Sequence, residues 1–258
     1  MKILLLGNSL MGCLLEAYRP DVHLRGYDVA FIVVPGADGP DLTISGDRLH
    51  PRNANQFPHN RPFCWPSAAW LEELKNQDAV VIGTLGFLDD PQFPGSSLLG
   101  RFSLPCFRIR DDLVNSQPPV TRAVAAASLR GQWSTQPGAL FSKRLRQVYS
   151  GRILVMPYPA PARSTLTDRS SLLSQIYQQP SDAAYFFEAL RQVWIKDWCR
   201  EHQLDLLDLD APGPDNPLTP DHLLAADRFH MAPRLSEIVL SQIDRWLAGV
   251  SNERQTRL

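Results

Sequence analysis

The amino-acid sequence predicts one three-layer α/β domain built on a mainly parallel sheet of five strands. The first observation is a series of short apolar runs with strand character, at residues 2–6, 27–34, 78–82, 152–156 and 204–209. The second is that segments with helical periodicity separate most of these runs along the chain. Strands that alternate with helices form a parallel sheet covered on both faces, with ligands bound beyond the carboxyl ends of the strands.

Helices fill the intervals between the strand candidates. Pro66 suits the first turn of a helix, because the N–H group that proline lacks would have no intrahelical partner there. In the longest helical segment Leu190, Trp194 and Trp198 recur at helical spacing with charged residues between them, which predicts a stripe facing the core. The expected helices cover residues 10–17, 66–75, 121–130, 138–148, 182–201 and 235–248.

Two loop-rich stretches interrupt this alternation. Residues 41–66 are polar and rich in Pro, Asn and His, and a small hairpin is expected around Gly46. Residues 87–120 are rich in proline, and a loop of this length inside a compact domain usually serves a function or moves. We therefore expect a single domain over residues 1–250 with two insertions, followed by a flexible polar tail at residues 251–258.

Composition and charge narrow the classes of partner. The 258-residue chain has a formal net charge of -1 with scattered basic residues, so nothing predicts binding to nucleic acid or to an anionic membrane. No apolar stretch has the length of a membrane span. The Leu-Met-Gly-Cys segment at residues 10–13 is similar to a lipoprotein cleavage box, but the apolar stretch before it is short and interrupted. The four cysteines lack metal-ligand or disulfide-framework spacing, so we expect a cytoplasmic protein with free thiols.

A candidate nucleophile lies directly after the first strand candidate. The segment Gly7-Asn8-Ser9-Leu10 follows the buried run, and a helical pattern starts at Leu10, so Ser9 is expected at a strand-to-helix turn. The first N–H groups of a helix have no internal partner and carry the positive end of its dipole. They would stabilise the oxyanion that forms when the Ser9 hydroxyl attacks a carbonyl carbon. The simpler interpretation is that this segment only caps the helix.

A candidate base and its partner lie just before the last helix. Asp227 and His230 are three residues apart, so they face the same way if the segment coils like a helical turn. The carboxylate would then hold one imidazole N–H and leave the other nitrogen to accept the serine proton, as a Ser-His-Asp triad requires. An Asp-x-x-His segment also occurs by chance. The neighbouring pair Asp221 and His222 is an alternative that we interpret as a cap or surface pair.

This ordered set of segments resembles the SGNH hydrolase family, also called GDSL esterases or lipases. Residues 7–10 are similar to the nucleophile block, with Asn where Asp is usual, and residues 227–230 are similar to the fifth block. Gly36 stands in the place of the second-block glycine. Residues 77–84 resemble the strand that leads into the third block, and residues 153–161 resemble the strand that ends in a proline-rich turn.

The resemblance implies a flavodoxin-like sheet and a serine esterase mechanism. Ser9 would be the nucleophile, His230 the general base and then general acid, and Asp227 the residue that orients the histidine. The backbone N–H groups of Ser9 and Gly36 would form the oxyanion hole. The implied substrates are small O-acyl esters, including O-acetyl groups on carbohydrates, and the mechanism needs no metal or organic cofactor.

The third block departs from the family pattern. An Asn is expected after Gly83-Thr84, but the sequence has Leu85 and Gly86 there, and neither carries a side-chain donor. Loss of one oxyanion donor costs about 100- to 1000-fold in turnover in serine hydrolases. The backbone N–H groups of Gly83, Leu85 and Gly86 are therefore further candidates for the oxyanion hole. Side chains in the 41–66 insertion are also candidates, namely Asn53, Asn55 and Asn60, although each is also explained as a polar loop residue.

Other interpretations of the sequence remain open or are weaker. The same triad would serve an acyltransferase, in which a carbohydrate hydroxyl resolves the acyl-enzyme, and the missing Asn is also consistent with a binding protein on a degenerate hydrolase scaffold. Residues 7–12 imitate a dinucleotide fingerprint, but the middle glycine is missing and no acidic residue ends the second strand. The acidic pairs at residues 89–90 and 111–112 are explained as solvated loop carboxylates. The sequence does not indicate an oligomeric state.

Overall fold

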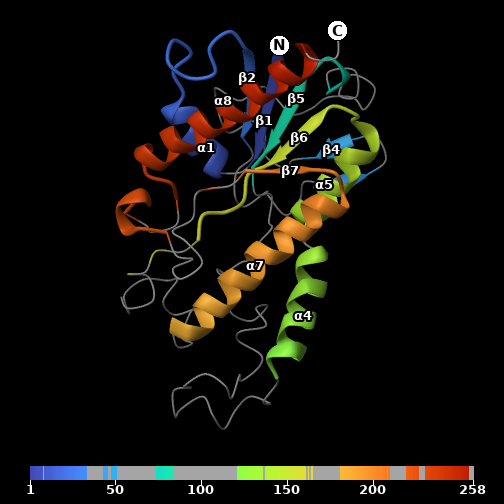
Figure 1. Ribbon diagram of the computed structural model, residues 1–258, viewed down its shortest axis with the longest axis vertical. Helices are drawn as coiled ribbons and strands as arrows, with labels where there is room; N and C mark the ends of the chain where they lie inside the picture. The colour runs from blue at the N-terminus through green and yellow to red at the C-terminus, as the bar shows by residue number, and fades with distance from the viewer. Residues whose placement is uncertain are drawn as a thin grey trace.

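The computed structural model describes residues 1–7, 9–33, 74–83, 121–135, 137–160, 181–207, 219–226 and 230–255, the strand pair 43–45 and 48–50, and the single residues Ala162, Ser164 and Leu209. In this part of the chain a parallel sheet lies between two layers of helices (Figure 1). The α/β class predicted from the sequence is confirmed.

The main sheet has five strands in the order β2-β1-β5-β6-β7. Every neighbouring pair is parallel; Leu4, for example, lies between Ala30 on one side and Val80 on the other. Without the separate hairpin this is the 2-1-3-4-5 order of flavodoxin-like sheets, so the flavodoxin-like sheet that the resemblance implies is confirmed. The strands are β1 (Lys2–Gly7), β2 (Asp28–Val33), β5 (Ala79–Ile82), β6 (Arg152–Val155) and β7 (Asp205–Leu206).

Helices cover both faces of this sheet. Figure 1 shows α1 and α8 next to each other on one side of the sheet, with α5 and α7 on the other. The described helices are α1 (Ser9–Ala17), α4 (Arg122–Ser134), α5 (Pro137–Val148), α7 (Ser181–Glu201), the short 3-10 helix η4 (Asp221–Leu223) and α8 (Pro233–Gln255).

Alternate strand residues point to opposite helical layers, which creates two hydrophobic cores. Leu4 of β1 belongs to the core that contains Phe141 of α5, whereas Leu5 belongs to the core that contains Leu10 of α1 and Val239 of α8. Full burial of such a side chain contributes about 1.5–3 kcal/mol. Because both faces of the sheet are buried, the strand sequences are continuous apolar runs without polar alternation.

The strand predicted at residues 204–209 is shorter in the structure. In the described part of the chain only Asp205 and Leu206 form β7, because this strand pairs with β6 and with no other described strand. Beyond β7 the Leu209 N–H donates a hydrogen bond to the Leu207 carbonyl at 3.1 Å. The apolar run therefore continues beyond the strand to pack against the core, with Leu207 buried.

Two helices are longer than predicted. α4 continues through Gly131 to Ser134 instead of ending near residue 130. α8 extends to Gln255 instead of ending near residue 248. Both corrections have the same physical cause, because elongating an existing helix requires little more than the absence of a strong breaker, and neither extension contains proline.

The hairpin expected around Gly46 is confirmed as β3 (Thr43–Ser45) and β4 (Arg48–His50), which pair antiparallel with Ile44 opposite Leu49. The rest of the 41–66 insertion and the whole 87–120 insertion lie outside the described residues. Of the helix expected at 66–75, only its last two residues are described, and they are helical.

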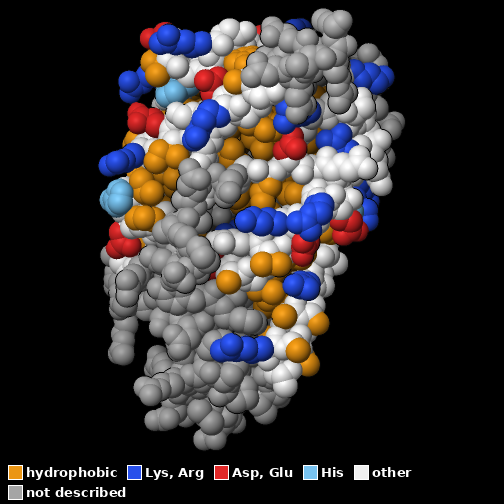
Figure 2. Space-filling model, viewed as in Figure 1, with side chains coloured by type: hydrophobic (Ala, Val, Ile, Leu, Met, Phe, Trp, Pro, Cys, Tyr) orange, Lys and Arg blue, Asp and Glu red, His pale blue; other side chains and the backbone are white. Residues whose placement is uncertain are grey.

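On the face in Figure 2, basic and acidic side chains of the described residues are interspersed, with no large patch of a single sign. Among the described helices, none combines the length and the apolar character needed to cross a bilayer.

Candidate active site

The carboxyl ends of β1 and β5 approach each other closely at two glycines. The Gly83 N–H donates a hydrogen bond to the Leu6 carbonyl at 2.7 Å. A Cβ atom added to Gly7 would lie 3.0 Å from the Gly83 Cα and 3.1 Å from the Cβ of Met11. Any other residue at position 7 would therefore push the two strand ends apart. The glycine pair keeps the backbone compact at the point where the chain leaves β1 toward Ser9.

Ser9 is the first residue of α1, as the sequence predicts, and its side chain is partly exposed. The next two residues, Leu10 and Met11, are fully buried and anchor the first turn of the helix against the sheet. No acidic residue lies in that first turn. The positive end of the helix dipole therefore lies beside Ser9, where it would stabilise a developing negative charge.

His230 lies three residues before α8 and is also partly exposed. Its backbone is held by a short antiparallel contact in which Leu224 pairs with Met231. The His230 carbonyl accepts a hydrogen bond from the Ala225 N–H at 2.8 Å, and the Ala232 N–H donates to the Leu223 carbonyl at 3.0 Å. Two backbone hydrogen bonds therefore fix the segment that presents the imidazole.

Ser9 and His230 lie on the same side of the sheet. Their next neighbours in the chain, Leu10 and Met231, are buried in the same hydrophobic core, and the helices α1 and α8 that follow them are packed together.

Four of the other predicted site residues lie outside the described residues, namely Gly36, Leu85, Gly86 and Asp227. Gly83 is described, at the end of β5.

The alternative acid-histidine pair lies on η4 at the surface. Asp221 and His222 are both exposed, and the Asp221 carboxylate accepts a hydrogen bond from the Ser164 N–H at 3.3 Å. This carboxylate holds the backbone at Ser164, which agrees with our interpretation of the pair as a surface feature.

The Cys199 thiol differs from a reactive cysteine. Cys199 is buried in α7, and burial, followed by the negative charge of Asp205, raises its thiol pKa to about 12. A thiol with that pKa carries almost no thiolate at neutral pH. Cys13 is partly exposed on α1, and both residues carry thiols rather than disulfides. Among the described residues, no three His, Cys, Asp or Glu side chains gather as metal ligands would.

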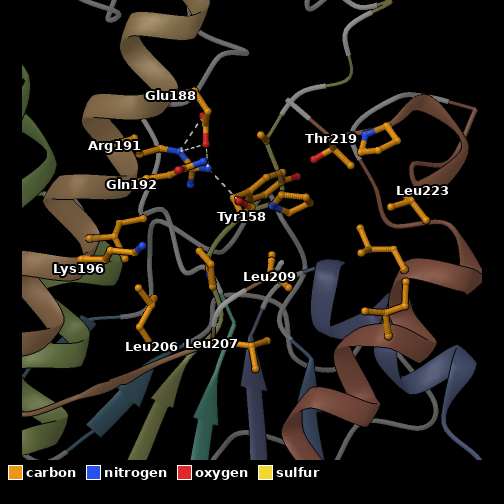
Figure 3. A pocket seen from close by; sticks show the side chains of 17 residues that line it. Tyr158, Glu188, Arg191, Gln192, Lys196, Leu206, Leu207, Leu209, Thr219 and Leu223 are labelled. Atoms are coloured by element: carbon orange, nitrogen blue, oxygen red, sulfur yellow. Dashed lines mark hydrogen bonds and ion pairs between the residues drawn. The ribbon is translucent and has the colours of Figure 1, made fainter. Parts of the chain in front are cut away.

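A cavity of about 320 Å³ lies beyond the carboxyl ends of β6 and β7, between α7 and α8 (Figure 3). Its described lining includes none of Ser9, Gly83 and His230. Instead it includes an ion pair that the sequence analysis did not single out: Glu188 and Arg191, whose side chains are each 6% exposed.

The signal for this pair was present in the helical spacing of α7. Arg191 lies three residues before the buried Trp194, and Glu188 lies seven residues before the buried Ile195. Both charged residues therefore occupy positions of the apolar stripe, where a buried charge needs a specific partner.

No family model matches this sequence, and no curated protein matches it. Similar chains exist among solved structures. An SGNH hydrolase from Slackia heliotrinireducens is 18% identical with a TM-score of 0.41, and the match covers 95% of this chain and 97% of that one. A lipase/acylhydrolase from Enterococcus faecalis is 15% identical with a TM-score of 0.43, covering 96% and 95%. The acetylxylan esterase Axe2 from Geobacillus stearothermophilus is 16% identical with a TM-score of 0.41, covering 95% and 92%. Because these values describe only a distant similarity of backbone path, we argue function from the residues of this chain.

Proposed function

We propose that this protein is a serine hydrolase that cleaves small O-acyl esters, such as acetyl esters of carbohydrate hydroxyl groups, through an acyl-enzyme. The observation that carries the proposal is the position of Ser9. It is a partly exposed hydroxyl on the first residue of α1, just beyond the carboxyl end of β1, where ligands of parallel sheets bind. The anchored His230 segment lies on the same side of the sheet and supplies a base.

In the first half of the reaction the Ser9 Oγ attacks the carbonyl carbon of the ester, and His230 takes the hydroxyl proton. The negative charge that develops on the carbonyl oxygen is stabilised by N–H groups at the start of α1 and, by resemblance, by Gly36. The tetrahedral intermediate collapses when the C–O bond to the alcohol breaks, and His230 gives its proton to the departing oxygen.

In the second half a water molecule attacks the acyl-enzyme while His230 accepts its proton. The ester bond to Ser9 then breaks, His230 returns the proton to the Ser9 oxygen, and a carboxylic acid leaves with the other proton of the water and ionises in solution. Asp227 would hold the imidazole in the orientation that these transfers need and would stabilise the imidazolium. If a carbohydrate hydroxyl replaces water, the same steps give acyl transfer, and analysis of the products separates the two reactions.

Labelling with a fluorophosphonate tests the role of Ser9. The parent protein should form a covalent adduct at Ser9 and hydrolyse p-nitrophenyl acetate. Ser9→Ala should lose the adduct and lower kcat/KM about a thousandfold or more, because no other nucleophile is proposed. Ser241→Ala is the matched control, since Ser241 is an exposed serine on α8 that bonds only its own helix, to the Glu237 carbonyl. Equal turnover by parent and Ser9→Ala would rule out the proposal.

A pair of histidine variants tests the base. His230→Ala should reduce turnover nearly as much as Ser9→Ala, because the serine is a weak nucleophile without proton acceptance. His222→Ala, which removes an exposed histidine from η4, should keep parental kcat/KM. Parental turnover in His230→Ala together with loss of turnover in His222→Ala would show that His222 is the base.

A further inference from the structure

The cavity between α7 and α8 has one apolar wall and one polar end. Figure 3 shows Glu188, Arg191 and Tyr158 close together at one side, with Thr219 and Leu223 across the cavity. The rest of the described wall is largely aliphatic. The cavity volume of about 320 Å³ is within the range of small-molecule sites. The aliphatic lining includes Ile195, Leu206, Leu207, Leu209, Leu235 and Ile238.

Arg191 has one guanidinium nitrogen without a partner at this polar end. Its Nε donates to both carboxylate oxygens of Glu188 at 3.0 Å, and its Nη2 donates to the Tyr158 carbonyl at 3.0 Å and also contacts Glu188. The remaining Nη1 is buried, and no acceptor in the described part of the chain lies within hydrogen-bonding distance of it. The whole residue is 5% exposed. A charged donor buried without a partner is costly, and because Arg191 lines the cavity, its unpaired Nη1 is a group that a ligand would satisfy.

The charges around the cavity select the kind of ligand. Among the described lining residues, Glu188 neutralises one of the two cations, Arg191 and Lys196, and leaves a surplus of one positive charge. Glu188 would also repel a ligand with two negative charges, such as a phosphate dianion. Its side-on pairing with Nε and Nη2 fixes the guanidinium plane and leaves Nη1 as the donor for a ligand.

We propose that this cavity binds a small aliphatic monocarboxylate, with its carboxylate on Nη1 of Arg191 and its hydrocarbon chain against the aliphatic wall. The proposal does not depend on Ser9, since neither Ser9 nor His230 lines the cavity. A carboxylate matches the single surplus charge and accepts from Nη1, while its alkyl chain buries apolar area that the open cavity leaves uncovered.

Calorimetric titration with sodium hexanoate tests the proposal. Hexanoate should bind the parent and Ser9→Ala equally. Hexanamide should bind at least about tenfold more weakly than hexanoate, because it lacks the charge that strengthens the bond to Arg191. From acetate to hexanoate the affinity should rise by up to about fourfold per added methylene. No saturable binding of hexanoate by the folded parent, or equal binding of hexanoate and hexanamide, would overturn the proposal.

Variants locate the site. Glu188→Gln combined with Arg191→Met removes both buried charges together, because removal of Arg191 alone would strand Glu188. This double variant should bind hexanoate at least about tenfold more weakly than the parent does. Arg200→Met is the matched control, since Arg200 forms an exposed i,i+3 pair with Asp197 on the same helix. If the double variant does not fold, Leu223→Phe, which fills the cavity and keeps every charge, should weaken binding instead. Unchanged hexanoate affinity in either folded cavity variant would contradict the assignment.

Discussion

At the scale of single residues, the candidate active site depends on a close approach that only glycine permits. Gly7 ends β1 and Gly83 directly follows β5, and the space between them has no room for a Cβ atom. Because Ser9 begins the helix two residues after Gly7, displacement of the β1 end would move the nucleophile relative to the rest of the sheet edge.

Gly7→Ala should therefore reduce both stability and ester turnover. The new methyl group would lie 3.0 Å from the Gly83 Cα, so we expect a loss of about 1–3 kcal/mol in the free energy of unfolding, as for other overpacked sites. Gly131→Ala is the control, because Gly131 lies inside α4 with nothing within 4 Å of an added Cβ atom. That change should stabilise the protein by about 0.5–1 kcal/mol. Urea unfolding and p-nitrophenyl acetate turnover measure both effects, and a Gly7→Ala protein as stable and active as the parent would contradict the steric argument.

At the scale of elements, the short edge strand β7 is held by side chains as well as by its ladder. The Asp205 carboxylate accepts hydrogen bonds from Arg152 of β6, at 3.1 Å from Nε and 3.0 Å from Nη2, and from the Trp246 indole of α8 at 2.9 Å. The Arg152 guanidinium lies over the Trp246 ring, 4.7 Å from its centroid. Because Arg152 and Asp205 are the first residues of their strands, this cluster lies at the amino edge, opposite Ser9.

Asp205→Ala should lower the free energy of unfolding by about 1 kcal/mol and leave ester turnover unchanged. The estimate stays small because the side chains of Arg152 and Asp205 are 35% and 45% exposed, and water screens a pair of this kind. Asp197→Ala removes a more exposed i,i+3 partner of Arg200 on α7 and should change stability by less than about 0.5 kcal/mol. Equal losses in the two variants, measured by urea unfolding, would show that the Asp205 cluster does not hold the edge strand.

At the scale of the whole molecule, burial of Cys199 makes the free energy of unfolding depend on pH in the alkaline range. Burial raises the pKa of this thiol from 9.0 to about 12, so between these values the unfolded chain releases a proton that the native protein keeps. Ionisation therefore favours the unfolded state, and this contribution to stability is present below pH 9 and declines as the pH rises toward 12.

The free energy of unfolding of the parent should consequently fall more steeply between pH 8 and pH 10.5 than that of Cys199→Ala. The difference in slope cannot exceed about 1.4 kcal/mol per pH unit, the value for one proton. Urea unfolding under reducing conditions at both pH values measures it, and the alanine variant corrects for other groups that titrate in this range. Parallel pH dependences would show that the thiol ionises equally in both states.

The order and type of the elements were predictable because they depend on local patterns. The apolar run before Gly7 forms a strand and the pattern after it forms a helix, which places Ser9 at their junction. Helix ends were less predictable, because adding a few residues to the end of an existing helix changes the folding free energy only slightly. This applies to the extension of α4 past Gly131 and of α8 to Gln255. The support of His230 was not predictable at all, because the pairing of Leu224 with Met231 is a backbone contact without a sequence signature.

The sequence by itself determined the α/β class, the five strands and the junction that presents Ser9, because strand and helix periodicity are properties of neighbouring residues. Only the tertiary structure decided that Gly7 meets Gly83, that Glu188 and Arg191 are buried together, and that a cavity opens between α7 and α8. Each of these features arises where elements distant in the chain pack against one another. The amino-acid pattern of one helix does not predict which of its charged residues will be buried by another helix.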